Sequence, residues 1–160
     1  MSAPPRPEDY PRHSQDKLRY GDTDRLGHVN NAAFSTFLET GRVELLHDPA
    51  APLNAPGCSF VIVRLEIDYV AEILWPGAVD IATRVGSVGR SSVRLEQALF
   101  QDGRLVATAA SVVVHFDLAA RKSRPLPGPS VAALEALRRP AARARPGAAR
   151  AGPDARAPAR

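Results

Sequence analysis

The sequence predicts an α+β fold, in which one amphipathic helix packs against a curved antiparallel sheet of about five strands. Apolar residues recur at helical spacing between residues 32 and 47. Apolar and polar residues then alternate over most of residues 60–117, and turn sequences separate the alternating runs. With 160 residues, of which 44% are hydrophobic, the chain is long enough to form one domain with a sizeable core.

We expect the chain to divide into three parts. Residues 1–13 are rich in proline and polar residues, so they form a flexible lead-in. Residues 14–137 form the folded domain, and residues 138–160 form a disordered tail. The tail consists almost entirely of Ala, Arg, Pro and Gly, and it has no apolar side chain larger than alanine with which to bury a core.

The first expected elements are a strand over residues 16–20 and a helix over residues 32–47. The apolar stripe of this helix comprises Phe34, Phe37, Leu38, Gly41 and Leu45. Asn30 or Asn31 is a good N-cap, because an asparagine side-chain oxygen accepts a hydrogen bond from an unpaired helix N–H. Glycine inside a helix costs about 1 kcal/mol relative to alanine, so we expect Gly41 to lie against another backbone.

Four long strands are expected after this helix. In the first of them, one apolar face would be formed by Val61, Val63, Leu65, Ile67 and Tyr69. Turn sequences at residues 75–77, 89–92 and 102–103 separate the later strands, and a short helix over residues 130–137 follows. A sheet of about five strands has open edges, which a dimer that joins two sheets would cover.

The charge distribution argues against a nucleic-acid partner for the domain. The whole chain carries +4, but residues 138–160 contain seven Arg and one Asp, so residues 1–137 carry −2. The tail could bind nucleic acid or an acidic surface weakly, but a solvated extension is the simpler interpretation.

No signal-like or membrane-spanning apolar run is present, so we expect a cytoplasmic protein without a membrane partner. Cys58 is the only cysteine, which excludes an intramolecular disulfide and a cysteine-based metal cluster.

Residues 22–31 carry the chemistry. They place two carboxylates, an imidazole, a glycine and two carboxamides between a strand and the start of a helix, where backbone N–H groups are unpaired. Asp24 could deprotonate a water or attack a carbonyl carbon directly. Backbone N–H groups at the helix start would polarise the carbonyl oxygen, an effect worth roughly 3–4 kcal/mol per donor. His28 could orient water or a carboxylate, and Asn30 could hydrogen-bond to either.

Other interpretations of these side chains do not involve catalysis. Asp22 is most simply a turn residue that bonds the local backbone. Asn31 could be only a cap, and His28 only a half-buried histidine. Asp22, Asp24 and His28 supply too few oxygen ligands for a hard cation, so we expect no metal and no cofactor. The Asp-x-Asp pattern of phosphatases normally ends an apolar parallel strand, and residues 17–20 are not apolar.

The sequence resembles the hotdog-fold acyl-CoA thioesterases of the 4-hydroxybenzoyl-CoA thioesterase type over about residues 15–127. The segments that carry the resemblance are Arg19-Tyr20-Gly21-Asp22-Thr23-Asp24, Gly27-His28-Val29-Asn30-Asn31, Phe37-Leu38-Glu39, Arg64-Leu65-Glu66-Ile67-Asp68-Tyr69, Gly89-Arg90-Ser91-Ser92 and Arg124-Pro125-Leu126-Pro127. The resemblance implies a sheet that wraps around a long central helix, and a homodimer or homotetramer with active sites at the subunit interface. The tail has no counterpart in the family.

The resemblance also implies roles for individual residues. Asp24 stands at the position of the catalytic carboxylate, and Asn31 at the position whose backbone N–H faces the thioester oxygen. Gly27 would let the loop pass close to the substrate. The turn Arg90-Ser91-Ser92 matches a segment that contacts the phosphates of coenzyme A, although only Arg90 is charged here. His28 and Asn30 match the pattern of a subgroup.

These observations favour hydrolysis of an acyl-CoA, or of an acyl-carrier-protein thioester. The alternatives are a hotdog domain that binds such thioesters without cleaving them, and a protein that binds nucleic acid through its arginine-rich tail. The sequence leaves open the acyl group, whether Asp24 is a base or a nucleophile, and the choice between dimer and tetramer.

Overall fold

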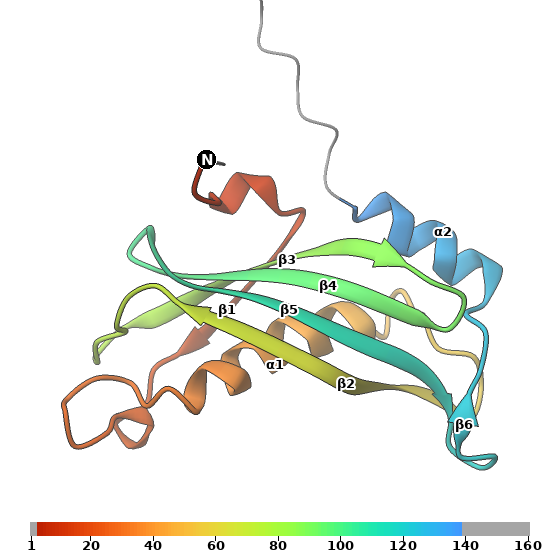
Figure 1. The fold of residues 1–160 in the computed structure, drawn as a ribbon, viewed down its shortest axis with the longest axis horizontal. Coiled ribbons are helices and arrows are strands. Elements are labelled where there is room, and N and C mark those ends of the chain that lie inside the picture. The colour runs from red at the N-terminus through yellow and green to blue at the C-terminus, as the bar shows by residue number, and fades with distance from the viewer. Residues whose placement is uncertain (1–2, 139–160) are drawn as a thin grey trace, which may run out of the picture.

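A six-stranded antiparallel sheet curves around helix α1 in the computed structural model, which describes residues 3–138 (Figure 1). The elements are η1 (Pro7–Asp9), β1 (Arg12–Lys17), η2 (Tyr20–Asp22), α1 (Ala33–Leu46), β2 (Cys58–Tyr69), β3 (Ala78–Val88), β4 (Ser92–Gln101), β5 (Arg104–Asp117), β6 (Lys122–Ser123) and α2 (Gly128–Ala136). The strand order is β1-β3-β4-β5-β2, with β6 paired to β5. The predicted α+β hotdog architecture, with one long helix held by a curled sheet, is confirmed.

Helix α1 buries the apolar stripe that the sequence predicts. Phe34, Phe37 and Leu38 pack with Ile81 and Leu99 on the inner face of the sheet. The C-terminal end of α1 meets a second group, in which Leu45 packs with strand residues and with Leu134 of α2. Helix α2 begins at Gly128, two residues before the predicted start. The core therefore lies between α1 and the sheet, and α2 closes one end of it.

Gly41 of α1 lies against the sheet, as predicted, but its neighbours are side chains and not a backbone. A Cβ atom at this position would lie 2.7 Å from Ile81 Cγ2 and 2.9 Å from both Gln97 Nε2 and Thr83 Oγ1. The Gln97 amide donates hydrogen bonds to Leu38 O at 3.0 Å and to Thr83 Oγ1 at 3.1 Å. The missing side chain of Gly41 thus lets the helix approach a buried polar group of β4.

The predicted apolar face of β2 is correct only in its second half. A register shift between Ile62 and Arg64 interrupts the pairing with β5 and reverses the alternation. Leu65 and Ile67 pack on the core, but Val63 is 62% exposed. Phe60 takes the inward place in the first half. The bulge is the physical reason for this correction.

The N-terminal prediction also needs correction. The first strand runs from Arg12 to Lys17 and not over residues 16–20, so the sheet includes residues assigned to the flexible lead-in. Tyr10 is 5% exposed and packs with Ala82, Ala98 and Phe100 on the outer face of the sheet. Strand β1 is almost entirely polar and is held by backbone pairing to β3, so it has no apolar alternation that could reveal it.

Apart from Arg138, the predicted disordered tail lies outside the described residues. In the part of the chain that the structure describes, every helix is too short or too polar to cross a membrane.

Candidate active site

The loop between β1 and α1 folds back on itself through backbone hydrogen bonds. The Asp24 N–H donates to His28 O at 2.8 Å, and the Gly27 N–H donates to Asp24 O at 3.1 Å. An isolated antiparallel bridge joins Thr23 and Val29. Gly27 has a φ of +83°, which explains why a glycine closes this turn. The loop thus holds residues 24–28 as a compact unit beside the helix.

The two carboxylates of the loop have different surroundings. Asp22 Oδ2 accepts a hydrogen bond from the Arg19 N–H at 2.8 Å, which confirms that Asp22 is a turn residue. Asp24 is half-buried, and its Oδ1 accepts from the Leu26 N–H at 2.8 Å. Within residues 3–138, Asp24 Oδ2 accepts no hydrogen bond, so one carboxylate oxygen is free to act on water or on a substrate.

The start of α1 presents the Asn31 N–H away from the helix. The Ala33 N–H donates to Asn30 O at 2.9 Å, so the Asn30 carbonyl points into the helix. Because a trans peptide is planar, the N–H of Asn31 points in the opposite direction. No described residue accepts this N–H. The helix dipole favours negative charge at this end, so the N–H is suited to a developing oxyanion.

Asn30 holds the turn that precedes α1. Its side-chain oxygen accepts a hydrogen bond from the Ala32 N–H at 3.0 Å. Helix α1 begins at Ala33 with Ala32 at the N-cap position, so the predicted N-cap at Asn30 or Asn31 is wrong. Asn31 makes no such side-chain cap. The Asn30 side-chain oxygen thus bonds the backbone of the site, and the expected bond from Asn30 to water or to a carboxylate stays a prediction.

One cavity of about 500 Å³ brings much of the motif together. Its lining residues are Asp24, Leu26, His28, Val29, Asn31, Phe34, Tyr69, Val70, Ala71 and Glu72. The loop and the start of α1 form one wall, and the end of β2 with the residues after it forms the other. Asp24, His28 and Asn31 are thus neighbours in space, whereas Asn30 lies outside the lining.

The wall contributed by the end of β2 was missed by sequence reasoning. Glu72 Oε2 lies 3.5 Å from His28 Nε2, and both side chains are partly exposed. The Tyr69 hydroxyl donates to Asn31 O at 3.1 Å, and its ring meets Phe34 edge-on at a centroid distance of 5.0 Å. No sequence spacing links residues 69–72 to the motif, because the fold alone brings them together.

The turn Arg90-Ser91-Ser92 lies elsewhere in the chain. Its backbone is anchored, since Arg90 O accepts from the Leu126 N–H at 2.9 Å and Ser91 O accepts from the His115 N–H at 2.8 Å. Through β5, Ser92 is level with Val61 of β2. Tyr69 at the cavity is eight residues further along β2, roughly 26 Å at about 3.3 Å per residue. A single chain does not bring this turn to Asp24.

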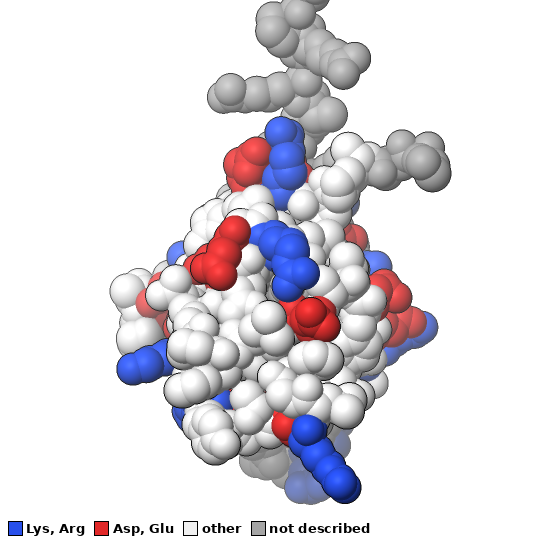
Figure 2. Space-filling model, turned by 90° about the vertical axis from the view of Figure 1, so that its left-hand side faces the viewer, with Lys and Arg blue, Asp and Glu red and all other residues white. Residues whose placement is uncertain are grey.

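The charges on the cavity end of the molecule are mixed. Figure 2 shows this end, with acidic and basic side chains next to one another among a larger uncharged surface. No broad patch of one sign covers the part of this face that the structure describes. Among the described residues, no three His, Cys, Asp or Glu side chains gather in a way that could hold a metal ion.

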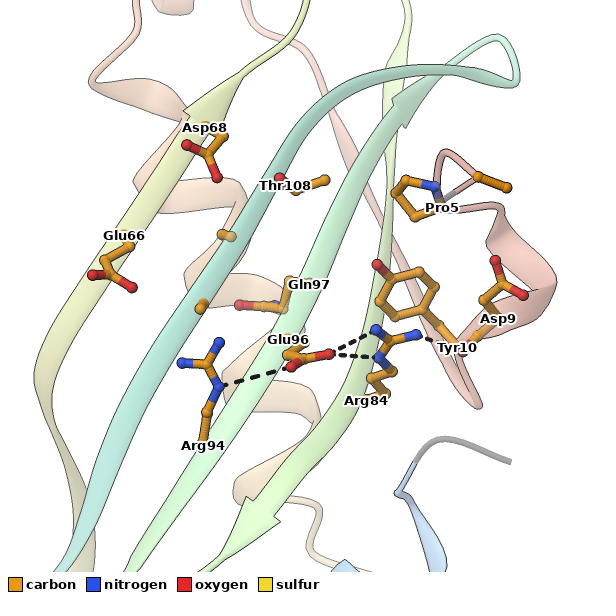
Figure 3. A pocket seen from close by; sticks show the side chains of 13 residues that line it. Pro5, Asp9, Tyr10, Glu66, Asp68, Arg84, Arg94, Glu96, Gln97 and Thr108 are labelled. Atoms are coloured by element: carbon orange, nitrogen blue, oxygen red, sulfur yellow. Dashed lines mark hydrogen bonds and ion pairs between the residues drawn. The ribbon is translucent and has the colours of Figure 1, made fainter. Parts of the chain in front are cut away.

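A second cavity, of about 420 Å³, lies on the outer face of the sheet beside the N-terminal segment (Figure 3). Three of its six charged side chains, those of Arg84, Arg94 and Glu96, are paired with one another. Arg84 donates to Glu96 Oε2 at 2.7 and 2.8 Å, and Arg94 lies 3.7 Å from the other oxygen of Glu96. The guanidinium of Arg84 also lies over the Tyr10 ring, 4.7 Å from its centroid. The contacts of Arg84 in this cavity are therefore structural ones.

Comparison with known proteins agrees with the fold. The family described as the thioesterase-like superfamily matches residues 18–137. The acyl-CoA thioester hydrolase YbgC of Escherichia coli O6:H1 is 30% identical over 120 residues, which cover 72% of this chain and 90% of that protein. The chain belongs to the thioesterase-like superfamily.

Solved structures show the same architecture. The PA5185 protein of Pseudomonas aeruginosa PAO1 superimposes with a TM-score of 0.76 at 28% identity, covering 84% of this chain and 96% of that one. A thioesterase from Thermus thermophilus, complexed with coenzyme A and zinc, gives a TM-score of 0.71 at 30% identity, covering 84% and 99%. The described domain thus matches nearly the whole length of these proteins.

Proposed function

We propose that this protein hydrolyses acyl-CoA thioesters to the free acid and coenzyme A. One observation carries the proposal: the free carboxylate oxygen belongs to Asp24, and the outward N–H belongs to Asn31, and both residues line the same cavity. A relative named as an acyl-CoA thioester hydrolase and a similar thioesterase with bound coenzyme A support the substrate class.

In the proposed reaction, the Asn31 N–H and the Asp24 carboxylate act on the same thioester group. The thioester carbonyl oxygen receives the Asn31 N–H, which stabilises the negative charge that develops as the carbon is attacked. Asp24 either removes a proton from the attacking water or attacks the carbon itself. In the second route an acyl–aspartyl anhydride forms, and water then cleaves it. In both routes the C–S bond breaks, the acid leaves, and the coenzyme A thiolate takes up a proton.

The remaining motif residues have supporting roles in this proposal. His28, beside Glu72, orients the water or the Asp24 carboxylate. Asn30 fixes the turn through the Ala32 N–H, and Gly27 provides the backbone conformation that closes the loop. A cytoplasmic location remains a prediction.

Replacing Asp24 by asparagine tests the reaction. We expect Asp24→Asn to keep the fold and to lower kcat about 1,000-fold, because a neutral carboxamide is neither a base nor a nucleophile. Thiol release from a panel of short, long and aromatic acyl-CoAs, followed with a thiol-reactive dye, measures this. Asp22→Asn is the matched control. It makes the same change two residues away, and asparagine can still accept the Arg19 N–H, so kcat should stay within about threefold.

Two results would count against the proposal. Turnover at the wild-type rate in Asp24→Asn would remove the role of Asp24. A wild-type protein that binds acyl-CoA or acyl-carrier-protein thioesters without releasing thiol would support the alternative, a hotdog domain that only binds them.

We also propose that two copies pair through β2, within a homodimer or a homotetramer. Strand β2 is a 12-residue edge of the sheet, and its Ile62 and Val63 side chains are 47% and 62% exposed. Such an edge favours strand addition. A two-fold axis near Leu65 would bring Val61 of the partner subunit opposite Tyr69. The partner's Arg90 turn would then approach the cavity, where Arg90 can contact the phosphates of coenzyme A.

A further inference from the structure

Tyr69 connects the end of β2 to the start of α1. Its hydroxyl donates a hydrogen bond to Asn31 O at 3.1 Å, across 38 residues of sequence. Its ring meets Phe34 of α1 edge-on, with the ring planes 73° apart. Phe34 is buried, so it gives the ring of Tyr69 a fixed surface to pack against. The ring contact thereby sets the place from which the hydroxyl donates.

The peptide that joins Asn31 to Ala32 is held at both of its polar atoms. Tyr69 bonds the carbonyl oxygen, and the Asn30 side-chain oxygen accepts the Ala32 N–H at 3.0 Å. The peptide before it is held by the bond from the Ala33 N–H to Asn30 O at 2.9 Å. Two consecutive peptide planes are therefore oriented, and the Asn31 backbone between them has little freedom.

Tyr69 also compensates for a weak helix start. The residue before α1 is Ala32, which makes no side-chain cap, and Asn31 lies on the surface. An exposed turn without a cap at that position would let the Asn31 peptide rotate. A donor contributes most to catalysis when its orientation is fixed before the charge develops, because no reorganisation is then needed.

We infer that Tyr69 is a positioning residue for the hydrolysis proposed above, and that it acts by holding the Asn31 backbone so that the Asn31 N–H points into the cavity. The inference rests on that proposed function. Because the N–H acts on charge that exists mainly in the transition state, losing its orientation lowers kcat more than it changes KM.

Tyr69→Phe tests this inference directly. The substitution keeps the ring and its contact with Phe34, and it removes only the hydroxyl. We expect kcat to fall about five- to tenfold, the size of one net hydrogen bond, while KM changes by less than about twofold. The full-length protein is assayed on the acyl-CoA that the wild type cleaves fastest.

Ser35→Ala is the matched control. The Ser35 hydroxyl donates to Ala32 O at 2.8 Å, so this variant also removes a hydroxyl–carbonyl bond at the start of α1. That bond acts on the peptide between Ala32 and Ala33. Its carbonyl oxygen also accepts the Ser35 N–H at 3.3 Å, so this peptide stays held when the hydroxyl is removed. We expect its kcat to equal that of the wild type. The backbone amide NMR resonances of Asn31 and Ala32 are recorded in all three proteins, and they should shift most in Tyr69→Phe.

Three results would contradict the role of Tyr69, and a fourth would contradict the proposed hydrolysis. A Tyr69→Phe protein with wild-type kcat would overturn the inference while leaving the role of Asp24 intact. Equal losses in both variants, together with lower thermal stability, would show a general weakening of the helix start and would also overturn it. Unchanged Asn31 and Ala32 amide resonances in Tyr69→Phe would also overturn the inference that Tyr69 holds the Asn31 backbone, and this result does not depend on turnover by the wild type. A wild type without turnover would defeat the proposed function itself.

Discussion

Gly41 shows how one absent methyl group sets the distance between α1 and the sheet. Beneath it, Gln97 bonds Leu38 O and Thr83, and its Oε1 accepts from Arg42 Nη1 at 3.3 Å. Burial lowers the pKa of Arg42, because the charged guanidinium has lost contact with water. The glycine thus permits a buried polar network that links the helix to two strands.

Gly41→Ala should destabilise the protein, although alanine is the better helix former. The new Cβ would lie 2.7 Å from Ile81 Cγ2, well inside normal contact, so the network or the helix must shift. We expect the free energy of unfolding to fall by about 1–3 kcal/mol, against a gain of about 1 kcal/mol from helix propensity alone. Urea denaturation measures it.

Gly128→Ala is the control for this experiment. A Cβ at Gly128 meets nothing within 4 Å, so the change should be neutral or slightly stabilising. A Gly41→Ala protein that is more stable than the wild type would show that the helix can move away at little cost.

For single residues, the sequence predicts the role of a side chain when its hydrogen-bond partner is close in sequence. Asp22 bonds a backbone group three residues away, so its type and position were sufficient to predict its turn-making role. Asn30 also bonds the local backbone, but the helix begins later than the sequence predicts, so the predicted N-cap at Asn30 or Asn31 is wrong. Tyr69 and Glu72 could not be found in this way. Their partners in the site are about 40 residues away in sequence, and only the closure of the sheet around α1 brings them together.

The N-terminal segment, defined here as residues 7–10, is an element that composition misrepresents. Its proline and its two acidic residues resemble a flexible lead-in, yet it covers the outer face of β3 and β4. Arg84 holds it through the Tyr10 ring and through a hydrogen bond to Asp9 O at 3.4 Å (Figure 3). The guanidinium is oriented by Glu96 on the neighbouring strand. Tertiary contacts of this kind leave no periodic signal in the sequence.

Arg84→Met should loosen this segment without affecting catalysis. The Arg84 side chain is 15% exposed, and methionine keeps its apolar stem while removing the bonds to Glu96 and Asp9. We expect a loss of about 1–3 kcal/mol in the free energy of unfolding and faster proteolytic cleavage within residues 1–11. Thiol release should be unchanged, since α1 and the cavity lie on the other face of the sheet.

Arg94→Met serves as its control. Arg94 is 44% exposed and reaches Glu96 only at 3.7 Å, so we expect a change below about 0.5 kcal/mol. Equal effects of the two substitutions would mean that Arg84 contributes no more than an ordinary surface charge.

For the whole molecule, the element order and the motif were sufficient to predict the α+β hotdog architecture. What could not be predicted is where the turn at Arg90 lies relative to Asp24. Strand lengths and pairing register decide this, and they place the turn at the opposite end of β2 from the cavity. The bulge near Val63 could not be predicted either. An extra residue in one strand reverses which side chains face the core, although apolar residues continue to alternate in the sequence.

Mixing two variants tests whether neighbouring subunits complete one site. If Arg90 acts on the partner's cavity, a dimer of Asp24→Asn with Arg90→Ala contains one cavity in which both residues are intact. After exchange of subunits at equal amounts, about one site in four is intact. Arg90→Ala alone should raise KM about five- to tenfold, the usual loss for one charged contact to a phosphate. At substrate concentrations below KM, the exchanged mixture should therefore be about three to five times as active as the unexchanged one.

A double variant with both substitutions provides the control, because its mixture with Asp24→Asn contains no intact site and should gain nothing on exchange. Light scattering on each sample reports the mass of the assembly. If exchange of the single variants gives only the average of the separate activities, each subunit works alone, and the Arg90 turn has no part in the partner's site. A lysine on an edge strand opposes strand pairing, so Val63→Lys should break an interface through β2. If activity rises on exchange but Val63→Lys leaves the mass of the assembly unchanged, the subunits pair through a surface other than β2.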